Sequence, residues 1–284
     1  MVSQRGTISC SQPDFQLIRF SIPFDGVCHI QLNRPPVNAL NTALWSELQQ
    51  ALNYAETKLY PETARVLLIS SNARGSIFSA GNDLTELHVP STTERRFKKF
   101  WTTSTSFLAR LYKTPLFTIS AMRGATPAGG FVMSLCCDYR IALSNTMMGL
   151  NEVAIGLAVP RYWGRLLLLT ISNRARGEEI LANGKMINAS EAYSLGLVNK
   201  IVDGDQKDHL HENALLAAQQ WAKQKETYGR ADTKLSVRQE FADSWEEYGV
   251  PESERSWKML SKPKVVKILG AIMHQLSKKT NAKM

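Results

Sequence analysis

The strongest constraint on the fold of this chain is the alternation of short apolar runs with helical patterns. The expected strands lie at 65–70, 116–121 and 139–143, and the expected helices at 44–59, 92–112 and 131–137. The runs have the length and apolar content of strands buried on both faces. Because strands that alternate with helices form sheets covered by helices, the pattern predicts a layered α/β fold.

The two ends of the chain differ in pattern. Strand-like runs at 15–22 and 27–32 flank Pro23-Phe24-Asp25-Gly26, a hairpin signal. A last strand is expected within 196–202, and only helices after it, at 206–225, 233–248 and 263–279. We therefore expect a core at 12–203 and a helical region at 204–284. The amphipathic tail is expected to pack on its own or on a neighbouring subunit.

Bulk properties exclude several classes. The 284 residues contain no apolar run near the ~20 that a membrane-spanning helix needs. The cysteines (Cys10, Cys28, Cys136, Cys137) lack metal or disulfide-framework spacing, which predicts reduced thiols. The formal charge of +9 indicates affinity for anions, either a phosphate-bearing ligand or nucleic acid, although solvated helix faces would explain its clusters equally well.

Common catalytic motifs are absent from the sequence. It has no HExxH or paired Cys/His spacing, so no metal site is expected. It also lacks a GxSxG elbow, a P-loop and a GxGxxG sequence. Serine hydrolases, P-loop nucleotide hydrolases and dinucleotide-binding enzymes are therefore disfavoured.

Two glycine-bearing loops stand between an expected strand and an expected helix. They are FSAGNDL at 78–84 and AGG at 128–130. Small residues let a ligand approach the backbone, and amides at a helix start lack acceptors. Two such amides could form an oxyanion hole. Two ordinary tight turns explain the same residues.

Glu152 lies in GLNEVAIGL, at 149–157, among uncharged residues. It could cap a helix or pair with a distant cation. Alternatively, apolar surroundings would raise the pKa of its carboxyl and suit it to accept and return a proton near neutral pH. The residues themselves leave both interpretations open.

Taken together and in order, several motifs resemble the enoyl-CoA hydratase/isomerase, or crotonase, superfamily. They are NRPPVNAL, FSAGNDL, SAMRGATPAGG, CDYRIA, GLNEVAIGL and NASEAYSLGLVNKIV. Within it, the sequence is most similar to mitochondrial-type Δ3,Δ2-enoyl-CoA isomerases. The resemblance implies a spiral of ββα repeats, a C-terminal helical trimerisation region and therefore a homotrimer.

The resemblance also implies a CoA thioester substrate and no separate cofactor. Basic residues would meet the CoA phosphates, so that no nucleic-acid partner is expected. The expected substrate-binding residues are Asn38, Ala39, Leu40, Ala80, Gly81, Asp83, Leu84 and Asn151.

Carried over by motif, the backbone amides of Asn82 and Gly129 would bind the thioester oxygen, and Glu152 would be the acid/base. Hydratases of this superfamily carry a second glutamate where this chain has Val132. The implied reaction is therefore isomerisation of 3-enoyl-CoA to 2-trans-enoyl-CoA in the oxidation of unsaturated fatty acids. Asn82 stands where similar isomerases commonly have an apolar residue.

Other functions stay open at this point. They are another crotonase reaction, namely enoyl-CoA hydration or dienoyl-CoA isomerisation, and RNA binding by a non-enzymic family member. The C-terminal Ala282-Lys283-Met284 resembles a peroxisomal address. A short presequence within 1–10, which has Arg5 and no acidic residue, would instead direct the chain to the mitochondrial matrix.

Overall fold

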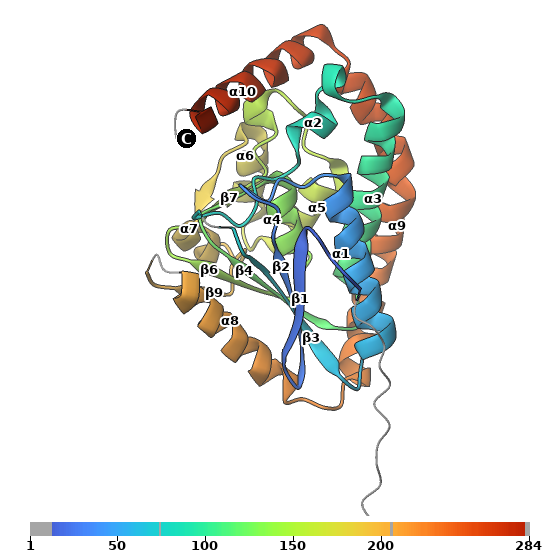
Figure 1. Ribbon diagram of the computed structural model, residues 1–284, viewed down its shortest axis with the longest axis vertical. Helices are drawn as coiled ribbons and strands as arrows, with labels where there is room; N and C mark the ends of the chain where they lie inside the picture. Colours follow the sequence, from blue (N-terminus) through green and yellow to red (C-terminus); the bar gives the residue numbers. More distant parts are fainter. Residues whose placement is uncertain (1–12, 74, 205–206, 282–284) are drawn as a thin grey trace, which may run out of the picture.

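The computed structural model describes residues 13–73, 75–204 and 207–281. A six-stranded sheet forms its centre, in the order β1-β2-β3-β4-β6-β9, and a three-stranded sheet, β5-β7-β8, lies beside it (Figure 1). The strands of the large sheet are β1 (Ile18–Phe24), β2 (Gly26–Leu32), β3 (Ala64–Ser71), β4 (Phe117–Met122), β6 (Tyr139–Leu143) and β9 (Lys200–Val202). Those of the small sheet are β5 (Ala125–Pro127), β7 (Met147–Gly149) and β8 (Ile187–Asn188).

The register confirms the predicted hairpin and shows that the rest of the large sheet is parallel. β1 and β2 pair antiparallel, and every later neighbour in the large sheet pairs parallel. All eight residues of β3 are buried, as expected of a central parallel strand. The layered α/β architecture expected from the sequence is therefore present.

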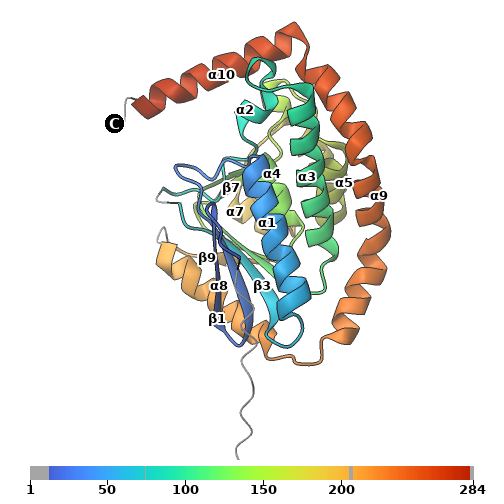
Figure 2. The same cartoon turned by 45° about the vertical axis from the view of Figure 1, so that its right-hand side comes forward.

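Helices cover both faces of the large sheet (Figures 1 and 2). They are α1 (Thr42–Tyr54), α2 (Leu84–Leu87), α3 (Glu94–Lys113), α4 (Ala128–Leu135), α5 (Arg161–Thr170), α6 (Arg174–Asn183), α7 (Ala189–Ser194), α8 (Lys207–Ala222), α9 (Tyr228–Leu260) and α10 (Pro263–Asn281). The main core lies between the sheet and α1, α3, α4 and α5. On the other face, α8 packs through Leu210, Ala214, Ala218 and Ala222, which recur every fourth residue.

One helix prediction was wrong. The expected 233–248 helix is part of α9, which runs for 33 residues and continues through Pro251. A proline inside a helix removes a backbone hydrogen bond and favours a break. However, Gly249, Glu252 and Ser253 are buried on the face that meets the core, and this packing keeps the helix going. The core boundary at 203/204 stays a prediction, as does the C-terminal region's role in forming a trimer.

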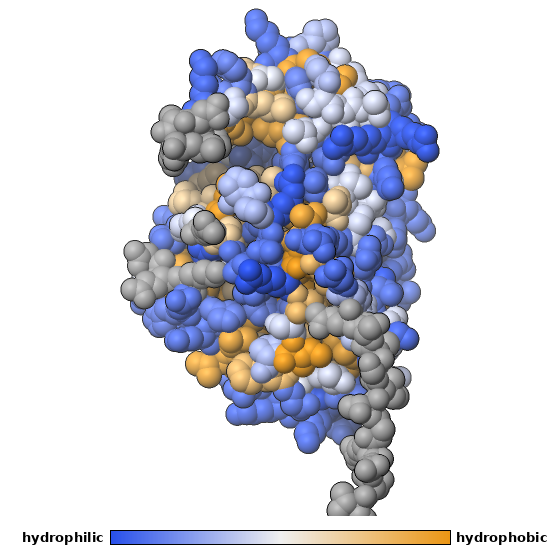
Figure 3. All heavy atoms as spheres, viewed as in Figure 1, coloured by the Kyte–Doolittle hydropathy of each residue, from blue (hydrophilic) through white to orange (hydrophobic). Residues whose placement is uncertain are grey.

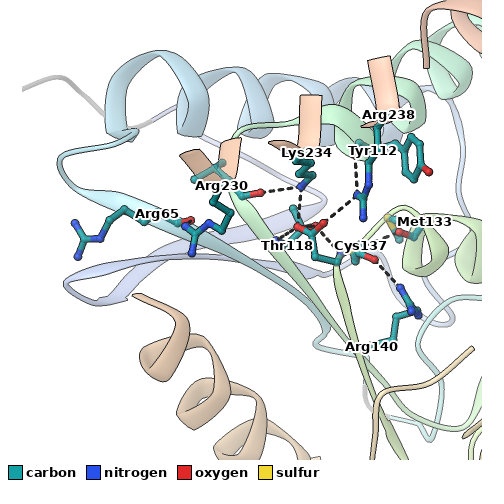
Figure 4. A network of polar contacts seen from close by, with 11 residues as sticks. Arg65, Tyr112, Thr118, Met133, Cys137, Arg140, Arg230, Lys234 and Arg238 are labelled. Atoms are coloured by element: carbon teal, nitrogen blue, oxygen red, sulfur yellow. Dashed lines mark hydrogen bonds and ion pairs between the residues drawn. The ribbon is translucent and has the colours of Figure 1, made fainter. Parts of the chain in front are cut away.

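A buried ionic network ties α9 to the large sheet (Figure 4). The Asp138 carboxylate, beside β6, accepts hydrogen bonds from Thr118 N–H at 2.7 Å and Lys234 Nζ at 2.7 Å, and pairs with Arg238 at 2.9 Å. Lys234 also donates to the Leu116 carbonyl at 2.9 Å. Burial alone would raise the pKa of Asp138, but the two cations outweigh it and hold the pKa below its ordinary value.

The described part of the chain has no helix long and apolar enough to cross a membrane. Cys28, Cys136 and Cys137 are buried and form no disulfides, which confirms the prediction for these three thiols. Cys10 and the two proposed targeting segments, at 1–10 and 282–284, lie outside the described residues.

We expect Asp138→Asn to lower the free energy of unfolding by about 3–5 kcal/mol, because it leaves the buried Lys234 ammonium without a counter-charge. The double variant Asp138→Asn/Lys234→Met should recover part of that loss, since both charges are then gone. Urea unfolding of the wild type, both single variants and the double variant measures the coupling. Strictly additive losses would contradict the proposed ion pair.

Candidate active site

A cavity of about 430 Å³ lies among four loops and the helices α3, α5, α9 and α10. Figure 3 shows the hollow on this face, below α10, with apolar side chains at its upper edge. The lining residues that come from these loops, and from the starts of α2 and α4 that follow two of them, are Val37, Ala39, Ala80, Asn82, Asp83, Leu84, Thr85, Pro127, Ala128, Asn151, Glu152, Ile155, Leu157, Ala158 and Pro160. The volume is in the range of small-molecule sites.

Glu152 is held on this wall without a partner. It follows the strand β7 and begins the short 3-10 turn Val153–Ile155, yet its side chain makes no capping bond. Glu152 is 7% exposed, and its two carboxyl oxygens are buried without a hydrogen-bond partner among the described residues. Burial therefore raises its pKa from 4.5 to about 7. Both the capping and the ion-pair explanations of Glu152 are thus excluded.

The loop that contains Asn82 is fixed by strand-like pairing with Leu40. Leu40 N–H donates to the Gly81 carbonyl at 2.8 Å, and Asp83 N–H donates to the Leu40 carbonyl at 2.9 Å. In this pairing, the N–H of Asn82 points away from Leu40 and donates to no other described residue. The backbone N–H of Asn82 therefore has no acceptor among the described residues and lies beside the cavity.

The second free amide belongs to Gly129, in the first turn of α4. The helix begins at Ala128, and the preceding Pro127 provides no side-chain cap. N–H groups in the first turn have no acceptor within their helix. A Cβ on Gly129 would lie 2.7 Å from Asn82 Oδ1, so any other residue here would displace the Asn82 side chain. The structure thus brings the two loops of the sequence prediction into contact.

Ion pairing and hydrogen bonds hold the neighbouring backbone. Arg34 donates to the Ala39 carbonyl at 2.7 Å and pairs with Asp83 at 2.9 Å. Asn38 adopts a positive φ of 50°, and its buried amide donates to Ser71 Oγ at 2.9 Å and to the Phe78 carbonyl at 3.0 Å. The buried Asn38 side chain therefore holds the loop at 78–84 in place through hydrogen bonds and does not face the cavity.

The predicted binding residues fall into two groups. Ala39, Ala80, Asp83, Leu84 and Asn151 line the cavity together with Asn82 and Glu152. Asn38, Leu40, Gly81 and Gly129 are not among its lining residues; the side chains of Asn38 and Leu40 are fully buried. The assignment of all these residues to CoA binding stays a prediction.

Among the described residues that line the cavity, Asp83 and Glu152 are the acidic ones. Asp83 is engaged by Arg34 and caps α2 by accepting from Thr85 N–H at 3.0 Å. Val132, where hydratases of this superfamily carry their second glutamate, is fully buried in the core. Glu152 is thus the one carboxylate on the described wall that is free to exchange a proton.

The rest of the wall is apolar. Its helical contributors are Leu87, Phe97, Trp101, Trp163, Ser256, Met259, Leu260, Ile272, Met273 and Leu276. The Trp101 and Trp163 rings stack at 6.0 Å. The residues of α9 and α10 were not predicted from the sequence, although the amphipathic pattern of these helices was an available signal.

The described residues offer no group of three or more potential metal ligands. No Lys or Arg lines the described cavity wall, so the expected contacts between basic residues and CoA phosphates are not located. The cavity can therefore hold an apolar chain, place two amide donors near one of its polar atoms and present one proton acceptor.

Comparison with known proteins gives a consistent result. The family model for enoyl-CoA hydratase/isomerase matches residues 24–262. Enoyl-CoA delta isomerase 1, mitochondrial, from Mus musculus is 29% identical over 89% of this chain and 85% of its own length. Enoyl-CoA hydratase domain-containing protein 2, mitochondrial, from the same species is 33% identical over 73% of this chain and 69% of its own.

Solved structures agree in fold. The human mitochondrial delta3-delta2-enoyl-CoA isomerase superposes with a TM-score of 0.84, at 29% identity over 93% of this chain and 99% of that one. An enoyl-CoA hydratase from Bacillus halodurans reaches 0.79 at 22% identity, over 90% of this chain and 100% of its own, which bears on the fold alone. The chain belongs to the enoyl-CoA hydratase/isomerase family.

Proposed function

We propose that this protein isomerises 3-enoyl-CoA, with a cis or trans double bond, to 2-trans-enoyl-CoA. The observation that carries the proposal is Glu152, one unpaired, buried carboxylate on a largely apolar cavity wall, close to the loops that carry the free N–H groups of Asn82 and Gly129. The relatives named as isomerases support this choice within the family. The product would enter the oxidation of unsaturated fatty acids.

The reaction requires a proton to move from one carbon to another. The α-proton of a 3-enoyl thioester is acidic because its removal gives a dienolate, whose charge lies largely on the thioester oxygen. In the proposed pose, the N–H groups of Asn82 and Gly129 donate to that oxygen and stabilise the charge. Glu152 removes the α-proton and returns it to the γ-carbon, so the carboxylate is regenerated.

The missing second carboxylate favours isomerisation over hydration. Adding water across a double bond requires a group that activates the water and a group that protonates carbon. The wall offers Glu152 for one role, while Val132 stands where the other would be. Asp83 is an unsuitable substitute, since Arg34 already pairs with it at 2.9 Å.

The proposed chemistry also sets what the protein binds. The proton that is removed is the one that is returned, so no redox cofactor or metal takes part, and CoA enters as part of the substrate. The apolar lining suits a fatty acyl chain. The homotrimer implied by the resemblance stays a prediction.

We expect Glu152→Gln to lower kcat for 3-enoyl-CoA by at least a hundredfold, since an amide of the same shape cannot accept the proton. Its Kd for a saturated acyl-CoA should stay within about threefold of the wild type, because the cavity keeps its form. Spectrophotometric turnover and calorimetric binding measure the two effects.

The control for this variant is a reaction-specificity assay. Wild-type protein should hydrate 2-trans-enoyl-CoA at least a hundredfold more slowly than it isomerises 3-enoyl-CoA. Near wild-type isomerisation by Glu152→Gln would exclude Glu152 as the base. Fast hydration by the wild type would favour the hydratase alternative.

The raised pKa predicts how the rate depends on pH. Because the base works ionised, kcat/KM should rise about tenfold per pH unit below about pH 7 and level off above it. A profile measured from pH 5 to 9 tests this. A plateau that already begins near pH 5 would show that the Glu152 carboxyl is not shifted.

Stability provides a second readout of the same titration. The folded state keeps a proton on Glu152 that the unfolded state has released between pH 4.5 and about 7, so this group's contribution is lost as pH rises through that window. Above pH 7, Glu152→Gln should therefore be more stable than wild type by up to about 3 kcal/mol. Below pH 4.5 the difference should vanish.

The compartment follows from two separate arguments. Relatives named as mitochondrial support the mitochondrial matrix. The terminal Ala282-Lys283-Met284 predicts the peroxisome instead. If the peroxisomal prediction holds, a fluorescent protein fused to the N-terminus of the full chain will collect in peroxisomes and disperse when these three residues are deleted. A free N-terminus with the fluorescent protein at the C-terminus tests import into mitochondria, and its failure would exclude that alternative.

A further inference from the structure

A second cavity, of about 580 Å³, adjoins the first. Both cavities are lined by Ala158, Pro160, Ser256 and Met259, which therefore form a shared wall. Two of these residues belong to the loop after Leu157, and two belong to α9. The second cavity lies beyond the apolar part of the first.

Met259 is the movable part of the shared wall. Its Sδ accepts a hydrogen bond from Ala158 N–H at 3.4 Å, which joins α9 to the loop. A thioether is a weak acceptor, and the unbranched methionine side chain changes rotamer at low cost. Pro160 is rigid, and Ala158 and Ser256 are too short to open or close a passage.

The far walls of the second cavity are fixed. Glu252 is 3% exposed, and its Oε1 accepts from Arg161 N–H at 2.6 Å, which secures the start of α5. On the outer side, Glu254 lies 3.5 Å from Lys98. These contacts hold the C-terminal half of α9 against α3 and α5, so the cavity keeps its shape when Met259 moves.

The second cavity has apolar sides and a charged rim. Val159, Pro160 and Pro251 form its apolar side beside Met259, and the buried Glu252, whose Oε2 has no partner among the described residues, lines it as well. Arg255, Lys258 and Lys262 also line it and are exposed. Long basic side chains place aliphatic stems along apolar surface while their charged ends stay in water. Such walls suit a hydrocarbon tail.

We propose that the second cavity receives the far end of a long acyl chain and that Met259 decides whether the chain can enter. This inference rests on the proposed function, since it names the substrate class of the same site. Short chains end in the first cavity, against Met259. Long chains displace its side chain, break the bond to Ala158 and continue between Val159 and Pro251.

The test measures kcat/KM for a series from 3-hexenoyl-CoA to 3-hexadecenoyl-CoA. Met259→Phe should lower the value for the longest substrates by about tenfold or more relative to the shortest, because it closes the passage. Met259→Ala should raise the same ratio, because it opens the passage. Met259→Leu keeps the side-chain size and should retain the wild-type profile. Ser256→Phe narrows the passage from the preceding turn of α9 and should act like Met259→Phe.

The outcomes separate this inference from the proposed function. If the wild type is active but Met259→Phe and Ser256→Phe change all chain lengths by the same factor, the second cavity is not an acyl site. If the wild type turns over no 3-enoyl-CoA, the proposed function fails. In that event, Kd values for saturated acyl-CoAs of the same lengths decide the matter. Selective loss of long-chain binding in both phenylalanine variants supports the inference, and an unchanged length profile overturns it.

Discussion

The site depends on a buried carboxyl group that has no neighbouring cation or hydrogen-bond partner among the described residues. Glu152 is 7% exposed, and its oxygens lack partners in the described part of the chain. A lysine or arginine on the wall would stabilise the ionised form and lower the pKa from its value of about 7. Such a residue would weaken the base. This constraint gives a reason for an apolar lining in a protein with a formal charge of +9.

A second constraint on the site is the close approach of the two loops that contain Asn82 and Gly129. Asn82 Oδ1 would lie 2.7 Å from a Cβ at position 129, so the two loops meet closely at Gly129, and Ala128 adopts a positive φ of 50°. That conformation costs of order 1–3 kcal/mol in a residue other than glycine. The pairing of Leu40 with the Asn82 loop and the ion pair between Arg34 and Asp83 hold the arrangement. These stabilising contacts thus offset the backbone strain at Ala128, beside the place where the ligand is expected.

Sequence reasoning recovered the parts of this protein that local patterns encode. The parallel sheet follows from fully buried runs such as 65–70, and the glycine loops from residues that tolerate close backbone approach. It failed where long-range packing decides the structure: the helix expected at 233–248 is only part of α9, whose buried face keeps the helix going past Pro251. It also could not find Met259 or Met273 in the cavity wall, because the contacts that place them join α9 and α10 to residues a hundred positions away. Glu152 was identified as a candidate, but its lack of a partner became evident only from the fold.

The long helix α9 connects these observations. Its first half is fixed to the sheet by Lys234 and Arg238 around Asp138, and its second half carries Ser256, Met259 and Leu260 to the cavity (Figures 2 and 4). Because α9 packs along α3 between these points, the buried charges near β6 and the acyl wall belong to one supported element. Because α9 is fixed in this way, the Met259 side chain can rotate and change the cavity wall locally without moving Glu152. If Glu152 and Met259 have the proposed roles, proton transfer and acyl-chain length depend on different residues of the same cavity, so variation at Met259 would alter the acyl chain accepted while the proposed chemistry at Glu152 stays the same.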